Sequence, residues 1–202
     1  MHQTFNLENI VETNIINWSS IHKNGDLWWQ HLKLRKRLFV DHEAWEVPHN
    51  EVAEWDQYDT ANSIYVVTHD QGRVLAASRL NPCSFEGGGW SYMIKDAIEG
   101  KLPGIPQDIL LQTPDRAGTW EATRFTVDPT LSSQDRNTYL AANAQALKLE
   151  AKSRGAKELI ALMPPAYVRW LTSNGLPTKR LGPTKRDGTG SRICVIGMDL
   201  NN

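Results

Sequence analysis

Acidic and aromatic side chains alternate in the run Glu54-Trp55-Asp56-Gln57-Tyr58-Asp59. This run concentrates side chains that could bind a ligand or take part in chemistry. The run closes a stretch of 25 residues, 35–59, with three basic residues, seven acids and three Trp or Tyr rings. Because its order fits neither a helical stripe nor a clean strand, the run predicts a loop. Such a loop suits a ligand that is cationic and partly apolar. The alternative is an acidic surface turn with two rings tucked beneath it.

Further charged residues stand inside apolar segments. Arg79 lies in VLAASRL, and Glu121 and Arg124 lie in TWEATRFTV. An unpaired buried charge costs several kcal/mol, on the order of a desolvation penalty, so strands that hold these residues need partners or a function for them. Arg35 and Phe39 fall one helical turn apart in the basic, interrupted apolar segment that precedes the acidic run.

The combined spacing of these pieces resembles that of the acyl-homoserine-lactone synthases, the autoinducer synthases of quorum sensing. The resemblance runs in order from about Leu32 to the C-terminal strand. It is carried by Arg35-x-x-x-Phe39, Trp45, the run 54–59, Ser78-Arg79-Leu80 and Trp120-Glu121-x-x-Arg124-Phe125.

This resemblance implies an α/β protein with the N-acetyltransferase-like fold, a single-domain αβα sandwich around a mixed, mostly antiparallel sheet. It also implies the reaction: an acyl thioester acylates the amine of S-adenosylmethionine, and ring closure releases methylthioadenosine. S-adenosylmethionine is then a substrate, and no separate cofactor is expected. Two other hypotheses stay open, an N-acyltransferase that uses a different amine and a catalytically silent protein that binds a methionine derivative.

Within this interpretation, Glu121 is the candidate general base for the amine. Burial on a strand beside aromatic rings raises the proton affinity of a carboxylate, while Arg124 would lower it, and the sequence leaves the outcome open. On a regular strand, side chains three residues apart point to opposite faces, so Glu121 and Arg124 share a site only if a bulge re-aims one of them. Arg124 could instead anchor the acidic run through Asp56 or Asp59. The plain alternative is that Glu121 and Arg124 are buried ion-pair partners.

Six residues are candidates for binding S-adenosylmethionine. Asp56 and Asp59 suit its sulfonium and amine. A ring of Phe39 or Trp45 suits a cation–π contact with the sulfonium, although a Trp is also a common core residue. The last two, which suit the substrate carboxylate or an ion pair with the acids, are Arg35 and Arg79.

The acyl donor is expected between splayed strands at Trp120–Val127 and Lys157–Met163, with Ala161 and Met163 lining the acyl pocket. Ala161 stands where some relatives carry a Thr associated with 3-oxo chains, so no preference for 3-oxo donors is expected. DPTLSSQDRN follows Val127 in place of a pyrophosphate-binding loop, which favours a phosphopantetheine-linked donor on acyl carrier protein. The candidate patch for that acidic carrier, or else an ordinary charged helix end, comprises Lys148, Lys152, Arg154 and Lys157, with Lys179, Arg180, Lys185 and Arg186 nearby.

A succession of strands and helices must position these residues. A turn at Asn24-Gly25-Asp26, with Asp26 as a possible N-cap, precedes a helix over 27–39. A hairpin is expected from β-rich runs at 63–67 and 74–80. The later expected elements are a short helix over 92–98, a central strand over 120–127, a helix over 135–153 capped by Ser132 or Ser133, a strand over 157–163, a helix over 166–173 and a strand over 192–200.

Length and composition set the outer limits. The 202 residues predict one domain, 1–202, with an N-terminal substrate-covering region at 1–60 and a sheet core at 61–202. A net charge of −1 argues against a nucleic-acid partner. Cys83 and Cys194 are far apart and read as small buried hydrophobes, and neither they nor the histidines have metal-ligand spacing. With neither a signal peptide nor a long apolar run, a cytoplasmic monomer without membrane insertion is expected.

Overall fold

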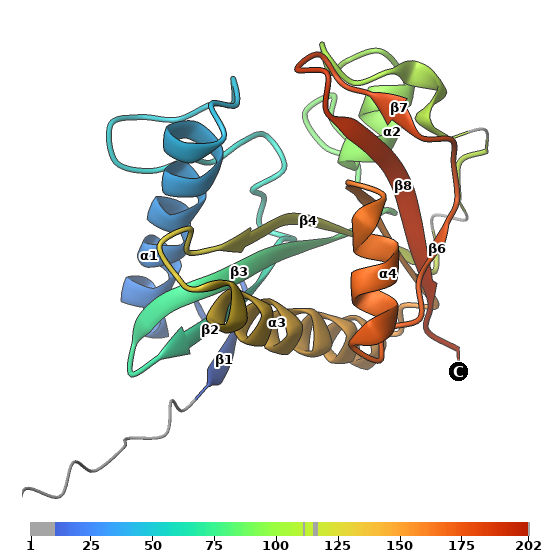
Figure 1. Ribbon diagram of the computed structural model, residues 1–202. Coiled ribbons are helices and arrows are strands. Elements are labelled where there is room, and N and C mark those ends of the chain that lie inside the picture. Colours follow the sequence, from blue (N-terminus) through green and yellow to red (C-terminus); the bar gives the residue numbers. More distant parts are fainter. Residues whose placement is uncertain (1–10, 111, 115–116, 202) are drawn as a thin grey trace, which may run out of the picture.

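One eight-stranded sheet organises the protein (Figure 1). The structure is a computed structural model that describes residues 11–110, 112–114 and 117–201, so residues 1–10 of the expected N-terminal region lie outside the described part. The strands are β1 (Glu12–Ile16), β2 (Ile64–Asp70), β3 (Arg73–Pro82), β4 (Thr119–Val127), β5 (Glu158–Met163), β6 (Lys179–Arg180), β7 (Lys185–Arg186) and β8 (Arg192–Asp199).

The strands follow the order β1-β2-β3-β4-β5-β8-β6, and β7 pairs with β8. All of these pairs are antiparallel except β4 with β5. This mixed, mostly antiparallel sheet confirms the expected architecture. The helices are α1 (Gly25–Arg35), α2 (Met93–Ile98), α3 (Ser133–Ser153) and α4 (Ala166–Ser173), together with 3-10 turns at Ile21–Lys23 and Gln107–Ile109 and a π-helical segment at Lys36–His42.

The hairpin formed by β2 and β3 confirms the prediction from the sequence. Its turn holds Gln71 and Gly72, both with positive φ, at 47° and 80°. Positive φ at both central residues matches the right-handed twist of paired strands, which is why a two-residue turn closes here. The hairpin brings Arg79 of β3 beside β4.

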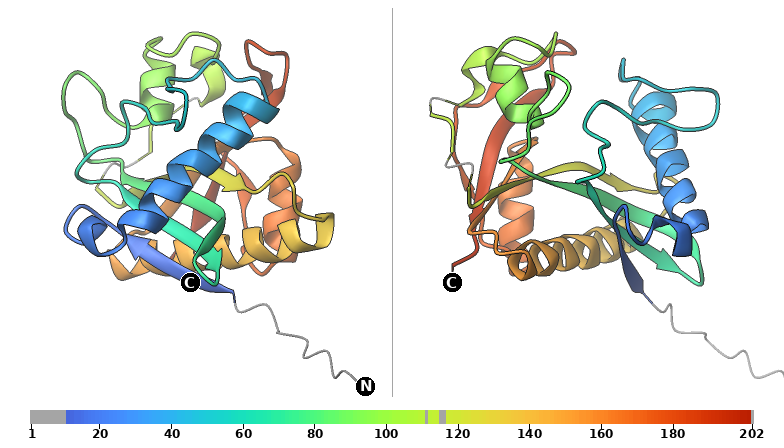
Figure 2. Two further views of the ribbon diagram at one scale, coloured as in Figure 1. Left: turned by 90° about the vertical axis from the view of Figure 1, so that its left-hand side faces the viewer. Right: turned by 180° about the vertical axis from the view of Figure 1, so that it is seen from behind.

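Helices α1 and α3 cover opposite faces of this part of the sheet (Figure 2). Alternate residues of β2 show the division. Tyr65 and Val67 pack with Leu34 of α1, whereas Ile64 and Val66 pack in the cluster that contains the buried face of α3. The expected inward positions of α3 are buried, and they are Leu140, Ala144, Leu147 and Ala151.

Three local expectations need correction. Helix α1 begins at Gly25, so Asp26 lies in its first turn instead of capping it, and the Asn24 side chain makes no capping hydrogen bond. The helix does not end at Phe39, because a π-helical segment carries it on to His42. The polar N-terminal segment contributes the unexpected strand β1, so the sheet has residues on both sides of position 60.

The only parallel pair of strands in the described sheet separates part of the way along. β4 and β5 pair at three positions, of which the last is Glu121 with Ile160. Beyond that point β4 continues to Val127 and β5 to Met163 without pairing to each other. We call the place where the strands part, at Glu121 and Ile160, the β4–β5 fork.

Candidate active site

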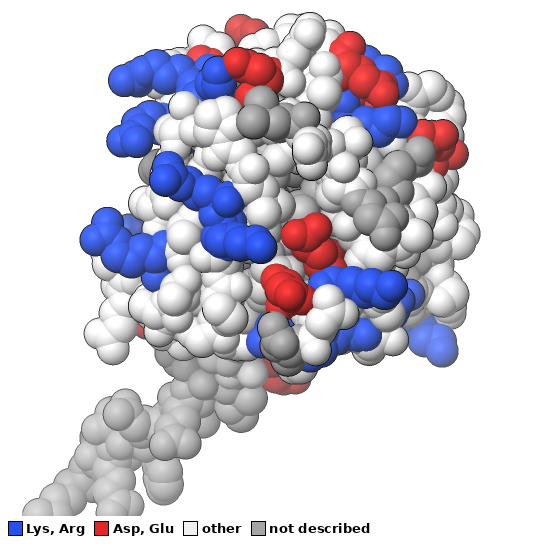
Figure 3. Space-filling model, turned by 90° about the vertical axis from the view of Figure 1, so that its right-hand side faces the viewer, with Lys and Arg blue, Asp and Glu red and all other residues white. Residues whose placement is uncertain are grey.

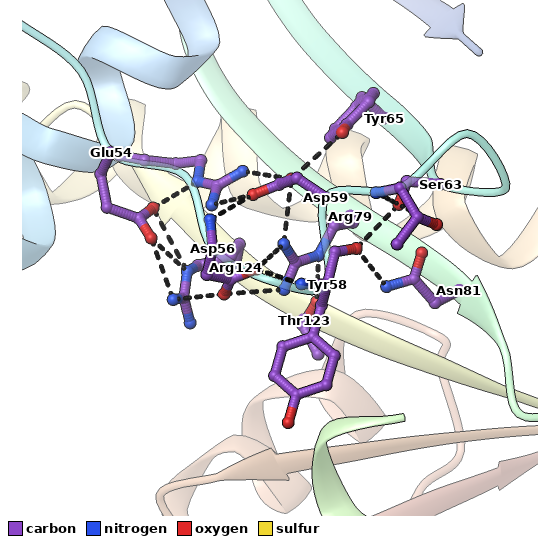
Figure 4. A network of polar contacts seen from close by, with 12 residues as sticks. Glu54, Asp56, Tyr58, Asp59, Ser63, Tyr65, Arg79, Asn81, Thr123 and Arg124 are labelled. Atoms are coloured by element: carbon purple, nitrogen blue, oxygen red, sulfur yellow. Dashed lines mark hydrogen bonds and ion pairs between the residues drawn. The ribbon is translucent and has the colours of Figure 1, made fainter. Parts of the chain in front are cut away.

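Residues 54–59, hereafter the acidic loop, are held by three arginines from three different elements (Figure 4). Arg35, from the end of α1, donates Nε to Glu54 at 2.5 Å and both terminal nitrogens to Asp59 at 2.8 Å. Arg79, from β3, contacts Asp56 at 2.5 Å and Asp59 at 2.9 Å. The loop and its arginines therefore form one ion-pair network.

Arg124, from β4, completes this network. Its Nη2 lies 3.0 Å from Glu54 and 2.6 Å from Asp56. The predicted anchoring of the acidic loop by Arg124 is thus confirmed for Asp56, and Glu54 is the second partner in place of Asp59. Three carboxylates face three guanidinium groups, so the formal charge of the network is balanced.

The network is almost sealed from solvent. The side chains of Arg35 and Arg79 are each 1% exposed, and that of Glu54 is fully buried. Burial opposes ionisation of Asp56, but Arg79 and Arg124 lower the pKa of that carboxyl below its usual value. For Asp59, Arg79 and Arg35 likewise outweigh burial and lower the pKa. Both acids are consequently ionised, and of the two roles left open for Arg35 and Arg79, pairing with the loop is the one observed.

A backbone irregularity lets Glu121 and Arg124 share one face of β4. Arg124 has φ of 53°, a left-handed conformation, and the register between β3 and β4 shifts at Ala77 and Arg79. Beyond this bulge Phe125 joins the core cluster to which Trp120 also belongs, although regular alternation would place them on opposite faces. The bulge that the sequence required is therefore present.

Glu121 is fully buried at the β4–β5 fork. Its two carboxylate oxygens accept hydrogen bonds from the backbone N–H groups of Met93 at 2.9 Å and Ile94 at 2.8 Å. Burial raises the pKa of Glu121 to about 7, against the lowering effect of these two amides and of Arg79. Burial thus outweighs the groups that lower this pKa. Glu121 and Arg124 have different partners and do not pair with each other.

Aromatic rings lie beside Arg124. Phe39 and Trp45 stack with centroids 4.7 Å apart and planes 16° apart, and the Arg124 guanidinium lies 5.4 Å from the centre of the Phe39 ring. Trp45 is 40% exposed, so it is not a core residue. The stacked pair forms a partly open aromatic edge next to the acidic loop.

The two candidate acyl-pocket residues lie on the other face of the sheet. Ala161 is buried and Met163 half-buried, and both belong to the core cluster between the sheet and helices α3 and α4. Phe125 makes edge-on or tilted ring contacts with Tyr167 and Trp170 in the same cluster. This region is apolar, as an acyl chain requires, whereas Glu121 and Arg124 face the opposite side of β4.

The basic residues expected to meet a carrier protein come from the end of α3, the start of β5 and the strands β6 and β7. Lys148 and Lys152 lie on the last turns of α3, and Arg154 is the residue that caps its C-terminus and pairs with Glu150 at 2.5 Å. Lys157 is exposed just before β5. The remaining four form strands β6 and β7. Figure 3 shows one face of the molecule, with several Lys and Arg side chains along its left margin and acids at its top and middle.

Several site residues escaped the sequence reasoning. The amides of Met93 and Ile94 gave no signal, because a backbone donor has no sequence signature. Glu54 was part of the recognised run but was not chosen as a site residue, although it bridges Arg35 and Arg124. The two cysteines are buried, as predicted. Among the described residues no group of three His, Cys, Asp or Glu side chains could hold a metal ion, and no described helix is long and apolar enough to span a membrane.

The fold and the fork define an α/β protein of the N-acetyltransferase-like class. Two solved structures illustrate the likeness of fold. A CoA-dependent acyl-homoserine lactone synthase, BjaI, with SAM and isopentyl-CoA, has a TM-score of 0.77 and 18% identity over 96% of this chain and 85% of that chain. TofI, in a ternary complex with an inhibitor and MTA, has a TM-score of 0.72 and 22% identity over 94% of this chain and 91% of that chain.

Sequence comparison then identifies the family. The sequence model of the autoinducer synthases matches residues 19–201. The acyl-homoserine-lactone synthase of Acinetobacter nosocomialis is 32% identical over 175 residues, 81% of this chain and 88% of the relative. That of Acinetobacter baumannii is 30% identical over the same length. The chain belongs to the autoinducer synthase family, whose members are acyltransferases that make acyl-homoserine lactones.

Proposed function

We propose that this synthase acylates the α-amino group of S-adenosylmethionine and then closes the lactone with release of methylthioadenosine. The observation that carries the proposal is Glu121, a buried carboxyl with a pKa of about 7 at the fork between β4 and β5. A base with that pKa is half ionised at neutral pH and is well matched to removing a proton from an ammonium group. Support also comes from relatives whose structures hold SAM or MTA.

The two steps balance without a further reactant. Glu121 accepts a proton from the ammonium group, directly or through one water, and the free amine attacks the thioester carbonyl. The C–S bond of the thioester breaks and the thiol leaves with a proton. The methionine carboxylate then attacks its own γ-carbon and displaces the sulfonium sulfur, which leaves as methylthioadenosine.

The acidic loop and the aromatic edge would hold the sulfonium substrate. Trp45, which is 40% exposed, offers a ring for a cation–π contact of about 0.5–2 kcal/mol. Phe39 is buried, stacks on Trp45 and has the Arg124 guanidinium over its ring, so we assign it to orienting Trp45. Asp56 and Asp59 are neutralised by Arg79 and its neighbours, so we assign them chiefly to shaping the loop. Direct contact of either acid with the sulfonium or amine stays a prediction.

The acyl chain would enter the apolar layer between the sheet and helices α3 and α4. Ala161 and Met163 lie on this side of β5, and the pantetheine arm would pass between the diverging strands. Ala161 offers a methyl group where a hydroxyl would be needed to bind a 3-oxo oxygen. Leaving such an oxygen buried and unpaired costs about 1–3 kcal/mol, so we expect no selection of 3-oxo donors.

Acyl carrier protein is the proposed donor in place of coenzyme A. The turn after β4, where coenzyme-A enzymes of this fold bind pyrophosphate, begins with Asp128, a buried acid that contacts Arg37 and Arg73 and accepts from Thr130. Because two arginines already neutralise this acid, the preference for the carrier rests on the sequence after Val127, DPTLSSQDRN, which lacks the pyrophosphate-binding loop. The basic residues on α3 and at Lys157 suit the acidic carrier, whereas BjaI is an example of a CoA-dependent relative.

The decisive experiment offers the purified protein S-adenosylmethionine with acyl-carrier and acyl-CoA donors of equal chain length. Formation of both lactone and methylthioadenosine, faster with the carrier-linked donor, is the expected result. Amide without methylthioadenosine would point to another N-acyltransferase reaction, and binding without turnover to a silent binding protein. The cytoplasmic location expected from the sequence remains part of this proposal.

A further inference from the structure

Helix α2 contacts both the acidic loop and the proposed base. Its first two residues, Met93 and Ile94, donate the amide hydrogen bonds to Glu121. The helix has only six residues, and a helix of that length is not stable by itself in water. The direction in which it presents the two amides must therefore be fixed by contacts with the rest of the protein.

Asp96 makes the polar contacts that fix it. This side chain is fully buried, and one carboxylate oxygen accepts from the Ser91 amide at 2.9 Å and from the Tyr58 hydroxyl at 3.0 Å. The other oxygen accepts from Lys101 at 2.9 Å. Asp96 thus joins the chain entering α2, the chain leaving it and a residue of the acidic loop.

Tyr58 is a firm anchor for this contact. Its amide donates to Asp56 at 2.9 Å, and its carbonyl oxygen accepts from Ser63 at 2.8 Å and from Asn81 at 3.1 Å. Its ring contacts that of Trp90 edge-on, with centroids 6.0 Å apart. The Arg79 guanidinium lies 5.8 Å from the centre of the ring. In Figure 4 the hydroxyl is at the end of the ring that points away from the ion pairs, and it donates to Asp96 of α2.

We propose that Asp96 and Tyr58 are positioning residues for Glu121, because their hydrogen bond ties α2 to the ion-paired acidic loop and keeps two amides on the carboxylate. The inference rests on the proposed role of Glu121 as base. Neither residue needs to touch the substrate. Burial and the nearby acids raise the pKa of the Tyr58 hydroxyl, so it stays a hydrogen-bond donor throughout the working pH range.

The hydrogen bond between Tyr58 and Asp96 should affect the pKa of Glu121. The two amides oppose the effect of burial on the pKa of Glu121, as does Arg79 of β3, while Asp56 of the acidic loop raises that pKa. Tyr58 is a further titratable group that interacts with Glu121, and it stays neutral. If α2 moves away, the amide bonds weaken, the pKa of Glu121 rises, and less of the base is ionised at neutral pH.

The test uses Tyr58→Phe, which removes only the hydroxyl. Tyr65→Phe is the matched control, because the Tyr65 hydroxyl also donates to a carboxylate of the acidic loop, that of Asp59 at 3.1 Å, without contact to α2. Asp96→Asn is the second variant, in which a donor replaces one acceptor oxygen. Two quantities are measured on the full chain, namely amide hydrogen exchange at Met93 and Ile94 by NMR and the acidic limb of the pH profile of kcat/KM.

In Tyr58→Phe, exchange at both amides should accelerate by about tenfold or more, and the acidic limb should move up by about half a pH unit. Asp96→Asn should change both in the same direction, whereas Tyr65→Phe should change neither. Unaltered exchange in Tyr58→Phe would overturn the positioning role, as would a response of the control equal to that of the variant. Normal turnover of Glu121→Gln would instead reject Glu121 as base, and the exchange data would still decide whether the tie exists.

Discussion

Glu121→Gln tests the proposed chemistry most directly, because the substitution keeps the size of the side chain but removes the base. General-base assistance contributes about 10²–10⁴-fold, so turnover should fall at least about 10²-fold. The wild-type rate should rise with pH through about 7, where Glu121 becomes ionised, and level off above it. The residual rate of the variant should lack this rise.

The same substitution has a distinct signature in stability. The pKa of Glu121 is raised from 4.5 to about 7 in the folded protein. The folded state therefore binds the proton more tightly than the unfolded state, and stability falls as pH increases from about 4.5 through 7. The rise corresponds to a penalty of about 3 kcal/mol above pH 7, since one pKa unit is about 1.4 kcal/mol.

Glutamine removes that penalty but introduces a mismatch. Its NH2 group replaces one of the two oxygens that accept from Met93 and Ile94, and an unpaired buried donor costs about 1–3 kcal/mol. At pH 8 the two effects nearly cancel, so the melting temperature should be close to that of the wild type or slightly higher. At pH 5 only the mismatch remains, and the variant should melt lower.

The role of Glu121 as base is tested by turnover with S-adenosylmethionine, and its raised pKa by thermal melts. Both are measured at pH 5, 6, 7 and 8 on one protein preparation. A Glu121→Asp variant, which keeps the carboxylate but shortens its reach, is the control and should retain the pH-dependent rise at a lower rate. Near-normal turnover of Glu121→Gln would remove Glu121 from the base role. A melting difference that is constant from pH 5 to 8 would show that the pKa of Glu121 is not raised.

Three further predictions concern the substrates. Asp56→Asn and Asp59→Asn should each raise the KM for S-adenosylmethionine several-fold, because each removes a partner of the buried arginines. Normal kinetics and a normal melting temperature in both variants would exclude the acidic loop from substrate binding. In a competition between 3-oxo and unsubstituted donors of one length, the wild type should show no preference. Ala161→Thr should gain a preference for 3-oxo chains, because its hydroxyl can add a hydrogen bond of about 1 kcal/mol. Clear selection of 3-oxo donors by the wild type would show that the pocket assignment is wrong. Arg154→Glu and Lys157→Glu should slow the reaction with acyl carrier protein and leave the acyl-CoA kinetics unchanged. The effect should be largest at low salt, where charges are least screened. An equal loss of rate with both donors would place these residues outside the carrier interface.

Because the formal charges of the ion-pair network balance, an Asp→Asn substitution in it should also lower the stability of the protein. Removing one partner from a buried ion pair leaves the other charge without compensation, which costs about 3–5 kcal/mol. In Asp59→Asn, both Arg35 and Arg79 lose a carboxylate oxygen's charge, although each keeps a second acid. Melting temperatures of these variants must therefore accompany every kinetic comparison.

The sequence by itself determined the elements that have a strong hydrophobic periodicity or clear capping and turn residues. The α3 face of Leu140, Ala144 and Leu147 follows from spacings of three and four, and its start follows from Ser132, whose hydroxyl accepts from the Asp135 amide. The hairpin follows from two β-rich runs around a Gly-containing turn. Five of the six residues of the ion-pair network were singled out as site residues from their types and combined spacing, and the sixth, Glu54, was not.

The tertiary structure decided which of the possible partners each charged group has. The sequence could not show that Arg35 and Arg79 pair with the acidic loop, because pairing depends on distances between α1, β3 and a loop that lie far apart in the chain. The left-handed residue at Arg124 is a backbone conformation, for which an arginine gives no sign. β1 escaped detection because strand pairing with β2, and not local composition, makes it a strand.

The state of Glu121 was beyond the sequence for the same physical reason. Its pKa is the balance between burial, which depends on every element packed around it, and two amides that belong to a helix 27 and 28 positions earlier in the chain. Backbone donors are present at nearly every residue, so only their placement in space makes them part of a site. The sequence identified the carboxylate as a candidate, and its burial in the fold raises its proton affinity.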